Sequence, residues 1–174
     1  MITEFRDEYR WLSNFAPVKI TYKGIEYASV EHAYMSAKSD DMEWKSKCAD
    51  KQITAGQIKR ESKDIMLVDN WDEIKVDVMH ECLIHKFNQE PFRRKLLATK
   101  LEEIQEGNTW NDTFWGVDIK TGEGANMLGL LIMDVRDDLF TEMIDLWHSS
   151  EGDGTPVHEF IGLTKEEYEK FVEG

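Results

Sequence analysis

The sequence predicts a mainly α-helical protein with one minor β element near its N-terminus. Apolar residues recur at helical spacing in two long segments, residues 73–89 and residues 127–147. Several shorter segments begin with residues that commonly cap helices. Only residues 18–27 alternate apolar and polar side chains in the manner of paired strands. We therefore expect a compact helical domain that carries a single β-hairpin.

Length and composition favour one domain with a small appendage. The chain has 174 residues, of which 41% are hydrophobic and 32% charged, enough for a sizeable core. We expect residues 1–148 to form the domain and residues 149–174 an acidic extension that ends in a short helix. No apolar run approaches the roughly 18 residues that span a membrane. The N-terminus lacks the apolar core of a secretory signal, so we expect a cytoplasmic protein.

The charge and the metal-binding residue types exclude several classes of function. A formal net charge of -14 disfavours extended nucleic-acid binding, which needs basic patches, but leaves room for a local basic pocket. Cys48 and Cys82 are expected to be buried reduced thiols. His80 and His85 are five residues apart, a poor spacing for sharing one metal from a helix face. We expect neither a metal nor a cofactor, and the oligomeric state is not predicted.

The first thirty residues predict a turn and then the hairpin. Four large apolar side chains are expected to pack inward: Phe5, Trp11, Leu12 and Phe15. Lys23 and Gly24 separate the two alternating runs and form the connecting turn. A hairpin of two strands is marginal in water, so it must pack against helices.

Capping residues predict where the helices begin. The expected starts are Ser29 for residues 30–39, Thr54 for 55–63, Asp72 for 73–89 and Pro91 for 92–100. Residues 40–51 suggest a polar helix, and residues 101–106 fit a strand or a turn. In the long helices the stripes expected to face the core are Val76, Met79, Leu83 and Phe87, and Leu128, Leu131, Val135 and Leu139. Thr164 and Glu167 form a capping box for the last helix, which either docks on its own domain or contacts a partner.

Glu31 in the first turn of the 30–39 helix has two interpretations. The commoner one is a solvated carboxylate that complements the helix dipole. The functional one is a carboxylate that points into a cleft, with Lys38 on the same side about 10 Å further along the helix axis.

The stretch from Thr109 to Gly129 has the composition of a ligand-binding loop. It combines large aromatics, carboxylates and glycines before a helix start, where free N–H groups favour anions. Asn126 is expected to cap the helix that follows. The alternative is a set of ordinary turns with buried tryptophans.

Several motifs occur in an order that resembles one family. They are Leu12-Ser-Asn-Phe15, Ser29-Val-Glu-His32 with Lys38, Trp71, Lys86-Phe87, Asp112-x-x-Trp115-Gly116, and Gly124-x-Asn126-x-Leu128-Gly129 with Met133 and Arg136. Over residues 5 to 140 the chain resembles the NADAR superfamily of YbiA-like proteins. The resemblance implies a compact, mainly α-helical domain with a minor β element. It departs at Lys59-Arg60, where the family usually has Gly-Arg, and at Val117, where an acidic residue is common.

The resemblance also implies hydrolysis of an N-glycosidic bond. The implied substrates are a ribosylamino-pyrimidine phosphate of riboflavin synthesis or ADP-ribosylated guanine. Glu31 and Asp112 would be the catalytic carboxylates, with their individual roles left open. The implied substrate-binding residues are Asn14, Phe15, Lys38, Arg60, Trp71, Trp115, Gly116 and Asn126. Two alternatives remain: a non-catalytic module that binds ADP-ribose or NAD derivatives, and an interaction protein that uses the acidic region from Asp137 onward.

Overall fold

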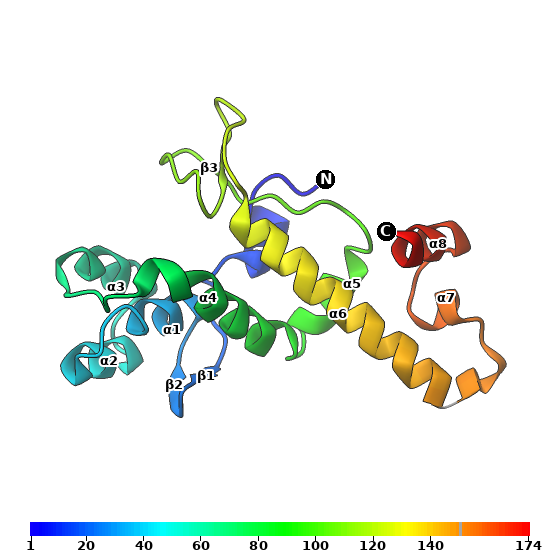
Figure 1. Ribbon diagram of the computed structural model, residues 1–174, viewed down its shortest axis with the longest axis horizontal. Helices are drawn as coiled ribbons and strands as arrows, with labels where there is room; N and C mark the ends of the chain where they lie inside the picture. The colour runs from blue at the N-terminus through cyan, green and yellow to red at the C-terminus, as the bar shows by residue number, and fades with distance from the viewer. Residues whose placement is uncertain (150) are drawn as a thin grey trace. The chain divides into compact units, whose positions relative to one another are not determined.

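The computed structural model describes residues 1–149 and 151–174, which pack as two compact units (Figure 1). We call Phe5–Gln89 the hairpin unit, and Met1–Glu4 together with Glu90–Gly174 the long-helix unit. Ser150, in the acidic extension expected over residues 149–174, lies outside the described residues. Helices dominate both units, which confirms the predicted mainly α-helical class.

The regular structure of the hairpin unit follows the predicted order. Its elements are η1 (Asp7–Leu12), β1 (Ile20–Tyr22), β2 (Ile25–Tyr27), α1 (Val30–Ser36), α2 (Met42–Ala49), α3 (Ala55–Glu61), η2 (Ser62–Asp64) and α4 (Trp71–Phe87). The strands pair antiparallel. Lys23 and Gly24 both have positive φ, 47° and 80°, the geometry of a two-residue turn that matches the strand twist. As expected, the hairpin packs against helices, α1 and α4.

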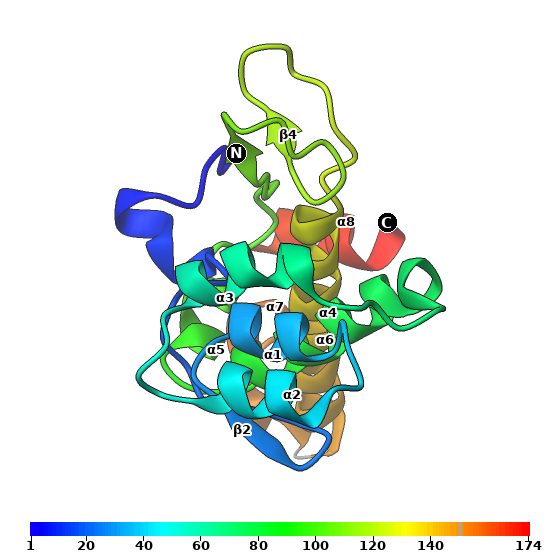
Figure 2. The same ribbon diagram turned by 90° about the vertical axis from the view of Figure 1, so that its left-hand side faces the viewer.

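Helix α1 is the centre of the hairpin unit. Figure 2 shows it between α2 and α3, and it also contacts α4. Every residue from Val30 to Ser36 is buried. Its polar groups are therefore bonded internally: the Ser29 side chain caps the helix by accepting from the His32 backbone N–H at 3.1 Å, and Nε2 of His32 lies 2.8 Å from the Ile53 carbonyl oxygen.

Two of the three side-chain caps predicted in this unit are confirmed and one is wrong. Ser29 caps α1, and Thr54 caps α3 within a complete capping box. Asp72 does not cap α4, which begins one residue earlier, at the buried Trp71. The Asp72 carboxylate instead accepts a hydrogen bond from Lys75, at 3.1 Å, within the first turn.

Burial differs from the predicted stripes at several positions. Val76 is only half-buried, whereas Lys86 joins the buried face of α4. Of the four N-terminal side chains expected to point inward, Leu12 is buried and Phe15 is 44% exposed. The other two, Phe5 and Trp11, are half-buried. Phe5 and Phe15 lie on irregular backbone, and Trp11 and Leu12 end the short 3-10 helix η1, so no helical or strand periodicity is long enough to predict which way these side chains face.

The long-helix unit is built on one helix of 23 residues. Its elements are α5 (Phe92–Ala98), β3 (Gly107–Asn108), β4 (Val117–Asp118), α6 (Met127–Ser149), η3 (Glu151–Gly154), α7 (Val157–Phe160) and α8 (Lys165–Glu173). The two short strands pair in parallel. Residues 101–106, predicted as strand or turn, contain a single bridge residue, Ile104, which pairs with Ile2. On α6 the buried stripe uses Ile132 in place of the predicted Leu131.

The C-terminal helices dock on their own unit. Phe140, Ile161 and Leu163 form a buried cluster that Tyr168 and Phe171 complete. The capping box between Thr164 and Glu167 is present at the start of α8. The expected docking is therefore confirmed, while the boundary at residue 148 stays a prediction. Among the described residues, no helix combines the length and the apolar character needed to cross a bilayer.

Candidate functional site

Glu31 is a nearly buried carboxylate at the start of α1. The residue is only 5% exposed, which rules out the interpretation as a solvated helix-start side chain. Its backbone N–H donates to the Asn14 carbonyl oxygen at 3.0 Å, so the Ser13–Asn14 segment is fixed against the first turn of α1. A carboxylate in such surroundings interacts more strongly with developing charge than it would in water.

Two aromatic rings and a lysine lie on the same side of α1 as Glu31. The Trp71 and Tyr34 ring centroids are 5.1 Å apart, with the planes tilted by 55°. Nζ of Lys38 lies 5.8 Å from the Tyr34 ring centroid and 5.9 Å from that of Trp71. The Lys38 carbonyl accepts from the Val68 N–H at 2.8 Å, which ties the loop before Trp71 to the end of α1. We call Glu31, Tyr34, Lys38 and Trp71 the Glu31 cluster.

The Glu31 cluster sets one carboxylate among several cations, in a protein whose net charge is negative. Burial lowers the pKa of Lys38. The negative charge of Glu31 opposes this shift, and the positive charges of Lys59 and Lys75 add to it. Three ammonium groups therefore act on one another beside a carboxylate. An anion bound here would relieve that repulsion.

Asn14 and Phe15 are distant from Glu31 in the sequence, but a backbone hydrogen bond joins Asn14 to Glu31. The Asn14 side-chain amide donates to the Met79 sulfur at 3.5 Å, and its Oδ1 is buried with no hydrogen-bond partner among the described residues. Such an acceptor is costly unless a ligand or a water molecule satisfies it. Nζ of Lys59 lies 5.6 Å from the ring centroid of the exposed Phe15. Arg60, next to Lys59 on α3, is exposed.

Lys86 is a residue of this region whose position the helical pattern does not reveal. It is fully buried in α4, and its ammonium group donates to the Ser13 carbonyl oxygen at 2.8 Å. Burial lowers the pKa of Lys86 to about 7. The lysine therefore holds the Ser13–Asn14 segment from the side of α4, while Glu31 holds it from α1. In the sequence, only the family resemblance, which includes the Lys86-Phe87 pair, indicated that Lys86 is a residue of interest.

Asp112, in the long-helix unit, organises a turn. Its Oδ1 accepts from the backbone N–H groups of Phe114, at 3.2 Å, and Trp115, at 2.9 Å. The Asn108 side chain bonds to both the N–H and the carbonyl of Asp112. The Trp115 and Phe114 rings meet edge to face at 4.9 Å. One carboxylate oxygen of Asp112 thus has a structural task.

Gly116 and Asn126 hold the same loop together. A Cβ at Gly116 would collide with the carboxylate and carbonyl of Glu106, so a larger residue does not fit. Asn126 has a positive φ of 51°. Its side chain accepts from the Glu106 N–H at 3.0 Å and donates to the Ile104 carbonyl at 2.9 Å. These bonds join the two ends of the loop, which is therefore fixed by more than local turns.

The structure thus sorts the predicted site residues into two groups. The hairpin unit brings together Glu31, Lys38, Trp71, Asn14 and, through Lys59, Phe15. The long-helix unit brings Asp112, Trp115, Gly116 and Asn126 into one loop, residues 104–126, which ends where α6 begins. Each group contains a carboxylate and a tryptophan, and the first also gathers cations suited to a phosphorylated ligand.

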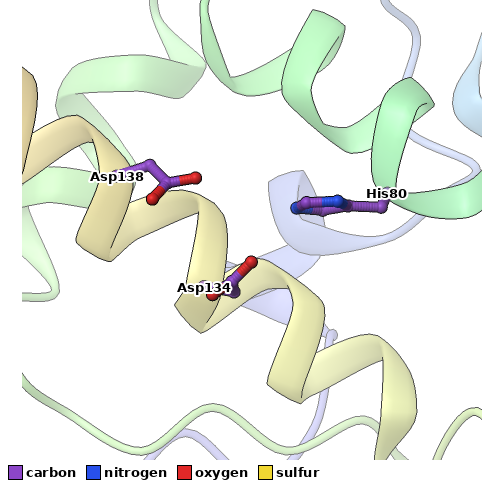
Figure 3. A group of neighbouring side chains, drawn as sticks. All are labelled: His80, Asp134 and Asp138. Carbon is purple, nitrogen blue, oxygen red and sulfur yellow. The ribbon is translucent and has the colours of Figure 1, made fainter. Parts of the chain in front are cut away.

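Carboxylates also gather further along α6, but without that chemistry. Figure 3 shows Asp134 and Asp138 leaving α6 on the same side, one turn apart, and His80 on α4. Burial raises the pKa of Asp137 between them, Arg136 opposes this, and the two neighbouring aspartates add to it. This stretch of α6 repels anions, in contrast to the Glu31 cluster.

Comparison with known proteins gives the family. The NADAR domain family matches residues 2–140. A riboflavin biosynthesis protein of Vibrio vulnificus is 36% identical over 136 residues, which are 76% of this chain but only 36% of that protein, so the chain spans about a third of its length. N-glycosidase YbiA of Escherichia coli is 33% identical over 140 residues, 78% of this chain and 85% of YbiA.

The fold agrees with these sequence matches. The NMR structure of Escherichia coli YbiA superposes with a TM-score of 0.72 at 30% identity, covering 81% of this chain and 84% of YbiA. All the predicted site residues fall within the matched region of the family. The chain therefore belongs to the NADAR domain family.

Proposed function

We propose that this protein is an N-glycosidase that hydrolyses the bond between a phosphorylated ribose and a nitrogen of its base. The observation that carries the proposal is Glu31, a carboxylate only 5% exposed in the first turn of α1, whose negative charge acts on Lys38. The names of the YbiA relatives, which are N-glycosidases, agree with it.

The chemistry assigns a role to each part of the Glu31 cluster. When the bond from the anomeric carbon to nitrogen breaks, positive charge develops on the sugar, as in glycosidase reactions generally. The Glu31 carboxylate stabilises that charge or aligns the attacking water. The water oxygen bonds to the anomeric carbon, and a proton goes to the departing nitrogen.

The surrounding residues bind and orient the substrate. Trp71 offers its face to the base or the sugar, an interaction that in nucleic-acid sites is worth about 1–3 kcal/mol per base. Lys38 and its neighbouring ammonium groups neutralise the phosphate. Asn14 Oδ1 accepts a hydrogen bond from the substrate. Asp112 as a second carboxylate remains a sequence-based prediction.

Two substrates fit this chemistry. One is a ribosylamino-pyrimidine phosphate, which agrees with the name of the Vibrio riboflavin biosynthesis protein. The other is ADP-ribosylated guanine. The competing function is a module that binds ADP-ribose or NAD derivatives without turnover, for which a buried carboxylate beside the ligand would be an electrostatic cost.

Product analysis by mass spectrometry tests the proposal. The protein and its Glu31→Gln variant are incubated with ADP-ribosylated guanosine and with a ribosylamino-pyrimidine phosphate. Free ADP-ribose, or free base with ribose 5-phosphate, is expected from the unmodified protein alone. If the folded protein binds these ligands but forms no product from either substrate, the enzyme proposal is wrong and the protein is a binding module.

A further inference from the structure

Lys86 is a buried cation that has no part in the reaction proposed above. Its side chain is fully buried in α4, and taking an ammonium group out of water is costly. A methionine would fill nearly the same space without that cost. The ammonium group donates to the Ser13 carbonyl oxygen at 2.8 Å, a bond that a methionine would not supply. The consequence of this bond falls on the next residue, Asn14.

The two peptide groups on either side of the Asn14 Cα are held by different helices. The Ser13 carbonyl belongs to the first peptide group and accepts from Lys86 on α4. The Asn14 carbonyl belongs to the second and accepts from the backbone N–H of Glu31 on α1 at 3.0 Å. Because each peptide group is planar and turns only about φ and ψ, bonds to both groups restrict the direction in which the Asn14 side chain leaves the backbone.

The end of the Asn14 side chain is held as well. Its amide N–H donates to the sulfur of Met79, on α4, at 3.5 Å. The side chain is nearly buried, and its Oδ1 has no hydrogen-bond partner among the described residues. An oriented amide with an open acceptor is suited to accept from one group at one position. In the proposed function that group belongs to the substrate.

We propose that Lys86 is a positioning residue of the N-glycosidase. Through the Ser13 carbonyl it orients the Asn14 side chain toward the substrate, and it does not touch the substrate itself. This inference rests on the proposed function, because it adds a residue to the support of that site. A misplacement of about 1 Å in a substrate-positioning group can lower a rate by about a hundredfold, so loss of the bond to Ser13 should be visible in turnover.

A double-mutant cycle on turnover tests whether Lys86 acts through Asn14. The variants are Lys86→Met, Asn14→Ala and the two together, with Lys86→Leu as a second substitution of the lysine. Replacing a buried charge by an apolar side chain of similar size usually preserves the fold, and thermal melts verify it. We expect each single variant to lower kcat/KM about tenfold. The double variant should also lose about tenfold rather than about a hundredfold, because Asn14→Ala has already removed the group that Lys86 orients.

Leu83→Val is the matched control. Leu83 is also fully buried on α4, and its side chain has no polar group with which to hold the Ser13–Asn14 segment. Its effect on kcat/KM should therefore multiply with that of Asn14→Ala. Lys86→Met should divide its loss between kcat and KM in the same proportion as Asn14→Ala, which a general loosening of α4 would not do. Effects of Lys86→Met and Asn14→Ala that simply multiply would overturn the proposal.

The Asn14 side-chain amide signals in NMR spectra give a readout that needs no turnover. They are identified by their disappearance in Asn14→Ala. We expect Lys86→Met to shift them and Leu83→Val to leave them in place. Unchanged signals in Lys86→Met would overturn the positioning role even if hydrolysis is established. Absence of hydrolysis by the unmodified protein would instead remove the proposed function, and with it the catalytic part of this inference, whatever the signals show.

Discussion

The two candidate carboxylates, Glu31 and Asp112, do different work in their units. Asp112 Oδ1 accepts two backbone N–H groups and so shapes the 112–115 turn. Glu31 is nearly buried and its charge acts on Lys38, and its own helix start is capped by Ser29 rather than by its carboxylate. The loop of the long-helix unit uses its polar groups to fix its own backbone. In the hairpin unit, the backbone N–H of Glu31 and the side chain of Lys86 hold the Ser13–Asn14 segment next to the start of α1.

The first way to sharpen this comparison is to remove the buried charge of Lys86. The pKa of Lys86 is about 7 when folded, against an ordinary value of 10.5. Between these values the unfolded chain binds one more proton, so stability rises with pH by about 1.4 kcal/mol per unit. Over the whole interval that amounts to roughly 5 kcal/mol.

In Lys86→Met this contribution to the slope should be absent. Denaturant unfolding at about pH 7.5 and about pH 9.5, both between the two pKa values, measures the free energy of unfolding of the two proteins. We expect the unmodified protein to lose stability relative to the variant as the pH falls. A difference that stays constant with pH would mean that the lysine charge is not desolvated. At high pH the variant should still be penalised by the Ser13 carbonyl, which it leaves without its donor.

The second prediction concerns Glu31 itself. Glu31→Gln keeps the size of the side chain and removes its charge, so we expect a fall in kcat of about a thousandfold, or about 4 kcal/mol. The variant should still fold, with a melting temperature no higher than that of the unmodified protein, because the charge of Glu31 offsets the positive charge of Lys38. Steady-state rates and thermal melts on the same preparations measure the two effects. Full activity in this variant would end the assignment.

The third prediction tests how tightly the 104–126 loop is packed. Gly116→Ala places a methyl group against the Glu106 backbone and carboxylate and should destabilise the protein by about 3 kcal/mol. Gly122→Ala is the matched control, since nothing lies within 4 Å of its added carbon and only its positive φ of 76° is strained. That change should cost about 1 kcal/mol. Equal costs in denaturant unfolding would show that the close approach at Gly116 relaxes freely.

The smallest effect is expected at Asp112. Asp112→Ala removes the acceptor for the N–H groups of Phe114 and Trp115 and should cost about 1.5 kcal/mol of stability. Asp112→Asn retains an oxygen acceptor and should stay within about 0.5 kcal/mol. If Asp112→Asn nevertheless loses turnover, the charge of Asp112 has a chemical role besides its structural one. Unchanged turnover would mean that Asp112 has only a structural role, in holding the turn whose N–H groups it accepts from.

Short-range signals in the sequence predicted most of the elements correctly. Ser29, Thr54 and Thr164 cap the helices that they were expected to cap, and Lys23-Gly24 makes the hairpin turn. In each case the bonding partners lie within a few residues, so the local sequence contains the whole interaction. The prediction failed at Asp72, where the burial of Trp71 in the tertiary structure accompanies an earlier helix start.

The site was predictable as a set of residues but not as an arrangement. The family resemblance named Glu31, Lys38, Trp71 and Asn14. It could not say that Glu31 is buried, that Lys59 lies over Phe15, or that Phe15 is exposed beside a cavity with two arginines. These features depend on contacts between α1, α3, α4 and the N-terminal segment.

The sequence by itself determined the helical class, the caps, the hairpin and the family, because periodicity, turn chemistry and motif order are properties of neighbouring residues. Only the tertiary structure decided which charges are removed from water. Lys86 and Glu31 look like ordinary surface residues in a helical pattern, and both are buried. Desolvation depends on what packs against a side chain from distant parts of the chain, and that is the physical reason why their roles emerge only from the fold.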